Sequence, residues 1–231
     1  SRGIDLSRLV VVNVVTIEEF RSKALRAVDI YLKKPEDERK PCMFVLDSLG
    51  MLSTEKEIRD ALDDKQVRDM TKSQLVKGAF RMLTLKLGQA NIPLIVTNHT
   101  YDVIGSYVPT KEMGGGSGLK YAASTIIYLS KKKEKDKTEV VGNIIKAKTA
   151  KSRLSKENKD VSIRLYFDDR GLDKYYGLLE LGELGGLWKN VAGRYEIAGK
   201  KIYAKQILAA PEEYFTEEVM HAKFISAIVN E

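Results

Sequence analysis

The 231-residue sequence contains one cysteine, two histidines and no apolar run long enough to cross a bilayer. A single thiol excludes an internal disulfide framework, and one cysteine with two histidines cannot make an ordinary structural zinc site. Cys42 stands at the entrance to an apolar run, so we expect a buried, inert thiol. The N-terminal residues do not resemble a signal peptide. With 31% charged residues and a negative mean hydropathy, the sequence is typical of a soluble protein.

The sequence also lacks the phosphate-binding pattern G-x-x-x-x-G-K-[ST]. The nearest approach is Arg194–Lys200, which begins with arginine instead of glycine and is followed by Lys201. The residues before Asp47 contain no glycine-rich turn between a strand and a helix. We therefore expect that this chain cannot cradle a triphosphate in the usual way.

The sequence has 39 basic and 32 acidic residues and therefore a net charge of +7. This charge permits an anionic partner such as nucleic acid. The lysines concentrate in Lys131–Lys137 and Lys146–Lys159, on or beside a predicted hairpin. A solvated hairpin tip is the simpler interpretation of the first run.

The first half of the chain alternates predicted strands and helices. Thr16 followed by Glu19 forms a capping-box pattern and predicts the start of a helix. A second helical pattern covers Ile58–Leu87. The apolar runs that predict buried strands are Leu9–Val15, Met43–Leu46 and Asn91–Thr97. This alternation favours a parallel sheet covered by helices.

The second half has a different texture. Thr100–Gly118 shows little periodicity and closes on a glycine run, so we expect a long functional loop. The lysine-rich tip is expected to join two strands, and a small α+β appendage follows from about Leu178, with a hairpin around Gly199 and a helix from Thr216. The predicted strands are Thr125–Ser130, Val140–Ala147 and Val161–Phe167.

Polar side chains stand where two of the predicted strands end. Asp47 and Ser48 follow one strand, and Asn98 and His99 follow the next. Ligands of open parallel sheets bind at the carboxyl ends of the strands, where an aspartate can support a magnesium ion and a histidine can contact a phosphate. An aspartate that only caps a turn and a histidine satisfied within its loop are the alternatives.

Taken in order, these motifs resemble RecA-type recombinases, and especially those of phage UvsX type. The resemblance covers essentially the whole chain. The segments that carry it are Asp47-Ser48-Leu49-Gly50, Asp69-Met70-Thr71, Asn98-His99-Thr100-Tyr101, Met113-Gly114-Gly115-Gly116, Leu119–Ser124 and Lys151-Ser152-Arg153.

The resemblance implies an α/β fold with a RecA-like P-loop NTPase core, in which a mostly parallel sheet is flanked by helices and has an antiparallel extension. The core would occupy residues 1–177 and be incomplete at its N-terminus. Residues 178–231 would form a small α+β C-terminal domain. The family's P-loop lysine and catalytic glutamate would belong to a segment before Ser1.

By the same resemblance, the cofactors of the intact protein are ATP and Mg²⁺. Asp47 would be the Walker B acid that supports Mg²⁺ through water, assisted by Ser48. His99 would take the place of the family's switch residue, which senses the γ-phosphate. Lys151 and Arg153 would reach the ATP of the neighbouring subunit, as an arginine finger does.

The resemblance places two DNA-binding loops, around Arg59–Asp69 and over Thr100–Ser117, and we expect the second to be mobile without DNA. Its glycines would offer N–H groups, and its tyrosines and Val108 would stack or wedge against bases. Alternatively, the tyrosines pack on the sheet edge and the glycines only make a turn. The DNA-binding candidates are Arg59, Lys65, Arg68, Lys72, Arg81, Tyr101, Tyr107, Lys111, Gly114, Gly115 and Gly116.

The implied function of the intact protein is that of a DNA-dependent ATPase. It would coat single-stranded DNA as an ATP-dependent filament and promote strand exchange in the cytoplasm of an infected bacterium. Its partners would be single-stranded and duplex DNA, further copies of itself, and phage mediator and single-strand-binding proteins. This chain alone is expected to be inactive as an ATPase. The alternatives are a non-catalytic DNA-binding or assembly module and a helicase-type motor of the same superfamily. The glycine run before Leu119 and the tail around Trp188 argue against the motor.

Overall fold

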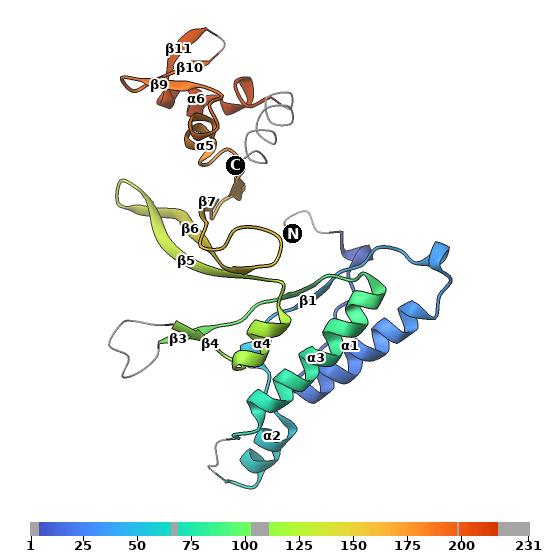
Figure 1. Ribbon diagram of the computed structural model, residues 1–231. Helices are drawn as coiled ribbons and strands as arrows, with labels where there is room; N and C mark the ends of the chain where they lie inside the picture. Colours follow the sequence, from blue (N-terminus) through green and yellow to red (C-terminus); the bar gives the residue numbers. More distant parts are fainter. Residues whose placement is uncertain (1–4, 66–68, 103–110, 198, 217–231) are drawn as a thin grey trace. The chain divides into compact units, whose positions relative to one another are not determined.

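The computed structural model describes residues 5–65, 69–102, 111–197 and 199–216 (Figure 1). The chain divides into two compact units, Ser1–Ser124 and Thr125–Glu231. The domain boundary expected at residues 177 and 178 lies inside the second unit and stays a prediction.

Helix α1 (Ile17–Leu32) begins where its capping pattern predicts. The Thr16 hydroxyl accepts the N–H of Glu19 at 3.1 Å, while the Glu19 carboxylate accepts the N–H of Val15 at 2.9 Å. These bonds satisfy two backbone donors near the start of the helix. The side chains that α1 buries are Ile17, Phe20, Ala24 and Val28.

The apolar run Leu9–Val15 is not the buried strand that the sequence predicts. It has no regular secondary structure, and Val10 and Val11 are 84% and 75% exposed. Its last three residues make contacts: the Asn13 carbonyl accepts from Lys23 at 2.8 Å, Val14 packs against the core, and the Val15 carbonyl accepts the N–H of Ser53 at 3.1 Å. A parallel strand is buried by partners beside it and by helices on its faces. Among the described residues no strand pairs with this run, and of its apolar side chains only Val14 packs against the core, which the pattern of side chains alone did not reveal.

The predicted parallel pairing is confirmed for two strands, β1 (Phe44–Leu46) and β2 (Leu94–Val96), with Phe44 opposite Leu94. Every other strand pairing within the described residues is antiparallel, so the parallel part of the fold is smaller than expected. Cys42 is exposed, and the expectation of a buried thiol is therefore wrong. The strand begins only at Phe44, so Cys42 lies outside the segment that the core covers.

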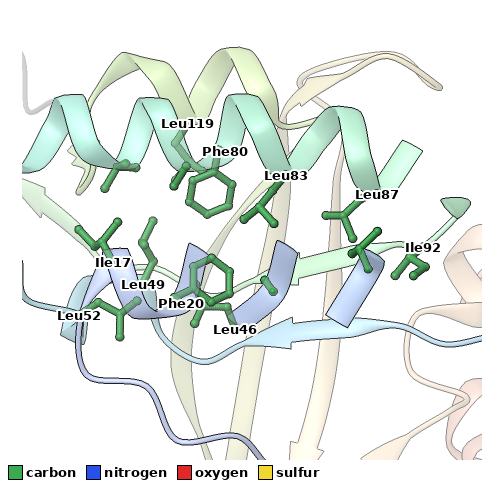
Figure 2. Packing of buried hydrophobic residues seen from close by; sticks show 14 of the residues in the cluster. Ile17, Phe20, Leu46, Leu49, Leu52, Phe80, Leu83, Leu87, Ile92 and Leu119 are labelled. Atoms are coloured by element: carbon green, nitrogen blue, oxygen red, sulfur yellow. The ribbon is translucent and has the colours of Figure 1, made fainter. Parts of the chain in front are cut away.

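The core of the first unit is formed by the helices α1 and α3 (Lys72–Ala90) together with the strands β1 and β2. Figure 2 shows Phe20 of α1 facing Phe80 of α3, whose ring centroids are 6.2 Å apart. Leu83 of α3 has no exposed surface, and Leu46 brings the end of β1 into the same cluster. This packing fixes α3 beside the carboxyl ends of the two parallel strands.

The helical pattern over Ile58–Leu87 is broken in the structure into α2 (Glu55–Leu62) and α3, and the single predicted helix is wrong. Asp64 has a φ of 55°, which lies outside the helical region. A capping box between Thr54 and Glu57 begins α2. The periodicity predicted both helices, but it did not reveal the turn between them.

Asp69 links the starts of these two helices. One carboxylate oxygen accepts the hydroxyl of Thr54, the N-cap of α2, at 2.6 Å. The other accepts the N–H and the hydroxyl of Thr71, the N-cap of α3, at 2.8 and 2.7 Å. The hydrogen bond from Thr54 and those from Thr71 lower the pKa of Asp69 to about 2, against the opposing effect of burial, with a further contribution from Lys56.

The loop expected over Thr100–Gly118 contains regular structure within its described parts. Strands β3 (Thr100–Asp102) and β4 (Lys111–Met113) pair in antiparallel fashion, and helix α4 (Ser117–Ala122) follows the glycines. The expectation of mobility falls on residues 103–110, outside the described residues.

The second unit begins with an antiparallel sheet of four strands in the order β5–β6–β7–β8. The sequence predicts that the lysine-rich run Lys131–Lys137 is a solvated loop at the hairpin tip, and the structure differs. Most of the run continues strand β5, and the chain turns only at Lys137, which has a φ of 54°. An exposed edge strand tolerates a row of solvated lysines. The charge of this run therefore did not mark the end of the strand. The strands are β5 (Thr125–Asp136), β6 (Glu139–Ser152), β7 (Asp160–Tyr166) and β8 (Leu172–Asp173).

The remaining described residues form the predicted mixture of helices and short strands around a separate small core. Trp188 is 4% exposed, and its indole N–H donates to the carbonyl of Leu179 at 2.8 Å. The predicted hairpin around Gly199 is confirmed. The elements are α5 (Leu178–Leu184), β9 (Lys189–Val191), β10 (Arg194–Ile197), β11 (Lys200–Tyr203) and α6 (Ala204–Ala209). In the part of the chain that the structure describes, no helix has the length and apolarity to span a membrane.

Gly182 of α5 leaves room for the Trp188 ring, since a Cβ atom there would lie 2.0 Å from the ring. We expect Gly182→Ala to destabilise the second unit by at least about 1–3 kcal/mol through overpacking. Trp188 is the sole tryptophan, so its fluorescence during urea unfolding reports on this core. Gly78→Ala on α3, where a Cβ meets nothing within 4 Å, is the matched control and should leave that transition unchanged.

The low pKa of Asp69 predicts a pH dependence of stability. A depressed pKa stabilises the fold fully above the ordinary value of 3.8, and the contribution is lost as the pH falls towards about 2. We expect Asp69→Asn to lower the melting temperature at neutral pH, and the gap to wild type to close between pH 4 and pH 2. Melting curves followed by the helical circular dichroism signal test this, and a gap that does not change with pH would contradict it.

Candidate functional site

The carboxyl ends of β1 and β2 meet at Asp47, as their parallel pairing predicts. The Thr97 hydroxyl donates to Asp47 Oδ1 at 2.5 Å. The Thr97 N–H donates to the Leu46 carbonyl at 3.0 Å, and its own carbonyl accepts the N–H of Leu49 at 3.0 Å. Thr97 therefore holds the turn that carries Asp47 and Ser48 by three hydrogen bonds. The Asp47 residue is exposed, so its carboxylate is accessible to a ligand at the strand ends.

Asn98 connects the end of β2 to the turn formed by Gly114, Gly115 and Gly116, here called the glycine turn. Its Nδ2 donates to the carbonyl of Gly114 at 2.7 Å, and its Oδ1 accepts the N–H of His99 at 2.9 Å. The Gly114 N–H donates to the His99 carbonyl at 3.2 Å. A Cβ on Gly50 would lie 3.0 Å from the ring of His99, so a larger residue would displace that ring. His99 itself is exposed.

The glycine turn lies against the first turns of α3. Gly115 and Gly116 have φ angles of 92° and 74°, a backbone region that residues with a Cβ rarely adopt. A Cβ on Gly115 would lie 3.2 Å from Val76, and one on Gly118 would lie 2.7 Å from Lys77. The glycines are therefore required by conformation at two positions and by close approach to α3 at a third.

A cavity of about 310 Å³ lies between the start of α3, the glycine turn and the end of β2. Lys72 lines it and forms an ion pair with Glu57 at 3.3 Å. Asn98 and Tyr101 also line it, and Tyr101 is 57% exposed. The structure thus brings together Lys72, Tyr101, Gly114 and Gly115 of the predicted DNA-binding set.

The other predicted DNA-binding residues of the first unit lie outside this cavity. Arg59 is exposed on α2, and Lys65 pairs with Asp63 at 2.9 Å. Arg81 is nine residues beyond Lys72 on α3, about two and a half helical turns, so the two side chains leave opposite sides of the helix. Gly116 contacts Ser73, and Lys111 begins β4. Arg68 and Tyr107 lie outside the described residues.

Lys151 and Arg153 belong to the second unit. Lys151 stands near the end of β6 opposite Ile126 of β5, and Arg153 follows the strand. The turn after the strand is held by Ser152 Oγ, which accepts the N–H groups of Leu154 and Ser155 at 3.1 and 2.9 Å.

Thr97, Lys77 and Asp69 were not among the candidate site residues that the sequence predicted. Thr97 follows a strand directly, which was a usable signal, and Asp69 stands two residues before the N-cap of its own helix. No feature of the sequence indicated that Lys77 contacts the glycine turn. In the described ranges, no group of three or more His, Cys, Asp or Glu side chains could hold a metal ion.

Comparison with known proteins identifies the family of the chain. Residues 3–173 match the RecA N-terminal domain family. The chain is 36% identical over 196 residues to the recombination and repair protein of Enterobacteria phage T4, across 84% of this chain and 48% of that protein. It is 26% identical to Protein RecA of Cereibacter sphaeroides (strain ATCC 17023) over 87% of this chain and 56% of that protein. For Protein RecA of Thermus aquaticus the identity is 26%, with 91% and 61% covered.

The chain spans about half the length of the curated relatives it matches, from 48% to 61% for these three. The match to the family covers well over half of the chain itself. The resemblance to RecA-type recombinases is confirmed, and the chain belongs to the RecA family.

Proposed function

We propose that this chain is the part of a recombinase that binds DNA and responds to nucleotide. In the intact protein it would coat single-stranded DNA as an ATP-dependent helical filament and promote strand exchange. Family membership supports this proposal. The observation that carries it is the bridge made by Asn98, which joins the strand end beside Asp47 to the glycine turn over α3.

The cavity beside α3 would receive a phosphate group of single-stranded DNA. Lys72 is the first residue of a 19-residue helix, where unpaired N–H groups and the helix dipole favour an anion. The glycine turn leaves its backbone accessible on the same side. Tyr101, beside Gly114, offers an exposed ring on which a base can stack. Contacts of this kind do not depend on sequence, as the coating of any strand requires.

The turn after β1 would be half of a nucleotide site for ATP and Mg²⁺. A magnesium ion is usually bound by one or two carboxylates together with waters and phosphates. Asp47 fits that role because it is exposed and is oriented by Thr97, and the Ser48 hydroxyl would assist it. When bound, the nucleotide supplies a γ-phosphate whose presence can be sensed at the strand end.

His99 would relay that signal. Its imidazole can donate to a phosphate or accept from a water, and its main chain is hydrogen-bonded to Gly114. A movement of His99 would therefore pull on the glycine turn directly. This supports coupling between the nucleotide and DNA without a longer pathway.

Lys151 and Arg153 would act in trans on the ATP of a neighbouring subunit. Cations delivered across an assembly interface stabilise charge on the transferring phosphoryl group, and hydrolysis then depends on filament formation. Arg153 is exposed on the turn after β6.

The sheet β9–β10–β11 would guide duplex DNA. Lys189, Lys200 and Lys201 are exposed on it, and the Arg194 guanidinium lies over the Tyr203 ring at 4.5 Å. The remaining proposed partners are phage mediator and single-strand-binding proteins, and the proposed location is the cytoplasm of the infected host.

Lys72 gives a direct test of the DNA site. We expect Lys72→Gln to weaken binding of a fluorescein-labelled oligo(dT) by several-fold. The slope of log affinity against log salt should fall by about 0.7 for the one lost phosphate contact. Fluorescence anisotropy at several salt concentrations measures both. Lys86→Gln on the same helix, whose lysine pairs with Asp29 at 2.7 Å, is the control and should change neither. Equal behaviour of the two variants would remove Lys72 from the site.

A second test concerns catalysis. Because the sequence has no phosphate-binding loop, we expect the purified 231-residue chain to show no DNA-stimulated release of phosphate from ATP. The assay is run at protein concentrations where the same preparation binds oligo(dT). Stimulated turnover that disappears in Asp47→Asn would contradict the expectation. Binding without turnover is also what a non-catalytic module would show, whereas ring-shaped assemblies in electron micrographs would favour a helicase-type motor.

A further inference from the structure

A carboxylate with no exposed surface stands at the base of the segment between α2 and α3, and the proposed function makes no use of it. The Asp69 side chain has 0% relative exposure. Three hydrogen bonds from Thr54 and Thr71 reach its two oxygens, and Lys56 Nζ lies 3.7 Å away. Burial of a charge is unfavourable unless donors replace the lost water, and here they do.

The residues that bind Asp69 are the N-caps of two helices. Thr54 begins α2 and Thr71 begins α3, so one carboxylate fixes the start of each helix relative to the other. Figure 1 shows α2 beside the first turn of α3. The ion pair between Lys72 and Glu57, at 3.3 Å, is a second link between the same helices.

Polar contacts matter unusually here because α2 contributes nothing to the hydrophobic core. None of its eight residues is buried. Its last residue, Leu62, is 82% exposed. An ordinary surface helix is positioned by its apolar face, whereas α2 is held to its neighbours by Asp69, by the Lys72–Glu57 ion pair and by the Glu55 N–H, which donates to the Glu18 carboxylate of α1 at 3.4 Å. Loss of one of these contacts therefore shifts α2 more readily than it would shift a helix packed on the core.

Helix α2 and the residues after it as far as Lys65, here called the α2 lobe, carry cations of the proposed DNA interface. Arg59 is exposed on α2 and Lys65 follows it. The other end of the link enters the cavity, because Asp69 lines it together with Lys72 and Gly115. The same carboxylate thus sets the distance between the lobe and the glycine turn.

We propose that Asp69 is a positioning residue for DNA binding, which holds the α2 lobe and its cations beside the start of α3 without touching DNA. This inference rests on the proposed function. The negative charge of Asp69 lies close to a surface that binds an anion, so charge alone would make Asp69 unfavourable for binding. Its positioning effect has the opposite sign, and the sign of a substitution effect therefore separates the two.

The test measures oligo(dT) affinity of the full chain by anisotropy, at a temperature where every variant is folded. We expect Asp69→Asn to bind about tenfold more weakly and its salt slope to fall by about 0.7 for each phosphate contact the lobe loses. Asp64→Asn is the matched control, since it removes an exposed charge from the same segment at a φ of 55° that asparagine tolerates. It should bind as well as wild type or slightly better.

A second pair of variants leaves the charge unchanged and decides the matter if Asp69→Asn does not fold. Thr71→Val removes a hydroxyl that donates to Asp69 at 2.7 Å, and Thr71→Ser keeps it. Weaker binding by the valine variant, rescued in the serine variant, supports the proposal. If Asp69→Asn binds as tightly as Asp64→Asn, or if valine and serine variants bind alike, the inference is wrong while the proposed function stands. A wild-type chain that does not bind oligo(dT) overturns both.

Discussion

The packing of α3 against α1 and the two parallel strands is the interaction on which the rest of the first unit depends. Leu83 and Ala79 of α3 have no exposed surface, and Val28 of α1 has none either. Burial of each large aliphatic side chain contributes roughly 1.5–3 kcal/mol, so a few such contacts exceed any single polar interaction nearby. The helix that this core immobilises also bears Lys72 at its first position. The proposed DNA site is therefore built on a helix that the core holds in place.

Beside that helix, at the ends of β1 and β2, the candidate site residues are held by polar contacts. Thr97 orients Asp47, and Asn98 joins the strand end to the glycine turn. Each is an exposed or half-buried hydrogen bond, contributing about 0.5–1.5 kcal/mol, and can be broken and remade at moderate cost. A rigid base with weaker polar links beside it would suit the proposed site, which would change state when a nucleotide binds or leaves.

The sequence was sufficient for those parts of the fold that local chemistry determines. Thr16 and Glu19 located a helix start, and the parallel pairing of β1 with β2 placed Asp47 beside the residues after Val96. The prediction of a buried strand at Leu9–Val15 failed. An apolar β-branched run indicates that its residues can be buried, but it does not show that a partner is present to bury them. The sequence pattern also joined α2 to α3, because the break depends on Asp64 and on a capping contact between Thr54 and Asp69, 15 residues apart. The family resemblance selected Arg59, Lys72 and Arg81 together, yet only helix geometry separates Lys72 from Arg81.

The exposed run Leu9–Val15 also has a consequence for self-association of the chain. Its only polar residue is Asn13, and it carries no charge or proline to discourage pairing with another strand. Short uncharged segments of high β-propensity are those that add to one another edge to edge. A net charge of +7 spread over the whole chain acts at longer range and is weakened by salt. Self-association of this chain should therefore be a local, strand-mediated event that added salt promotes, whereas added salt would weaken the proposed binding to nucleic acid.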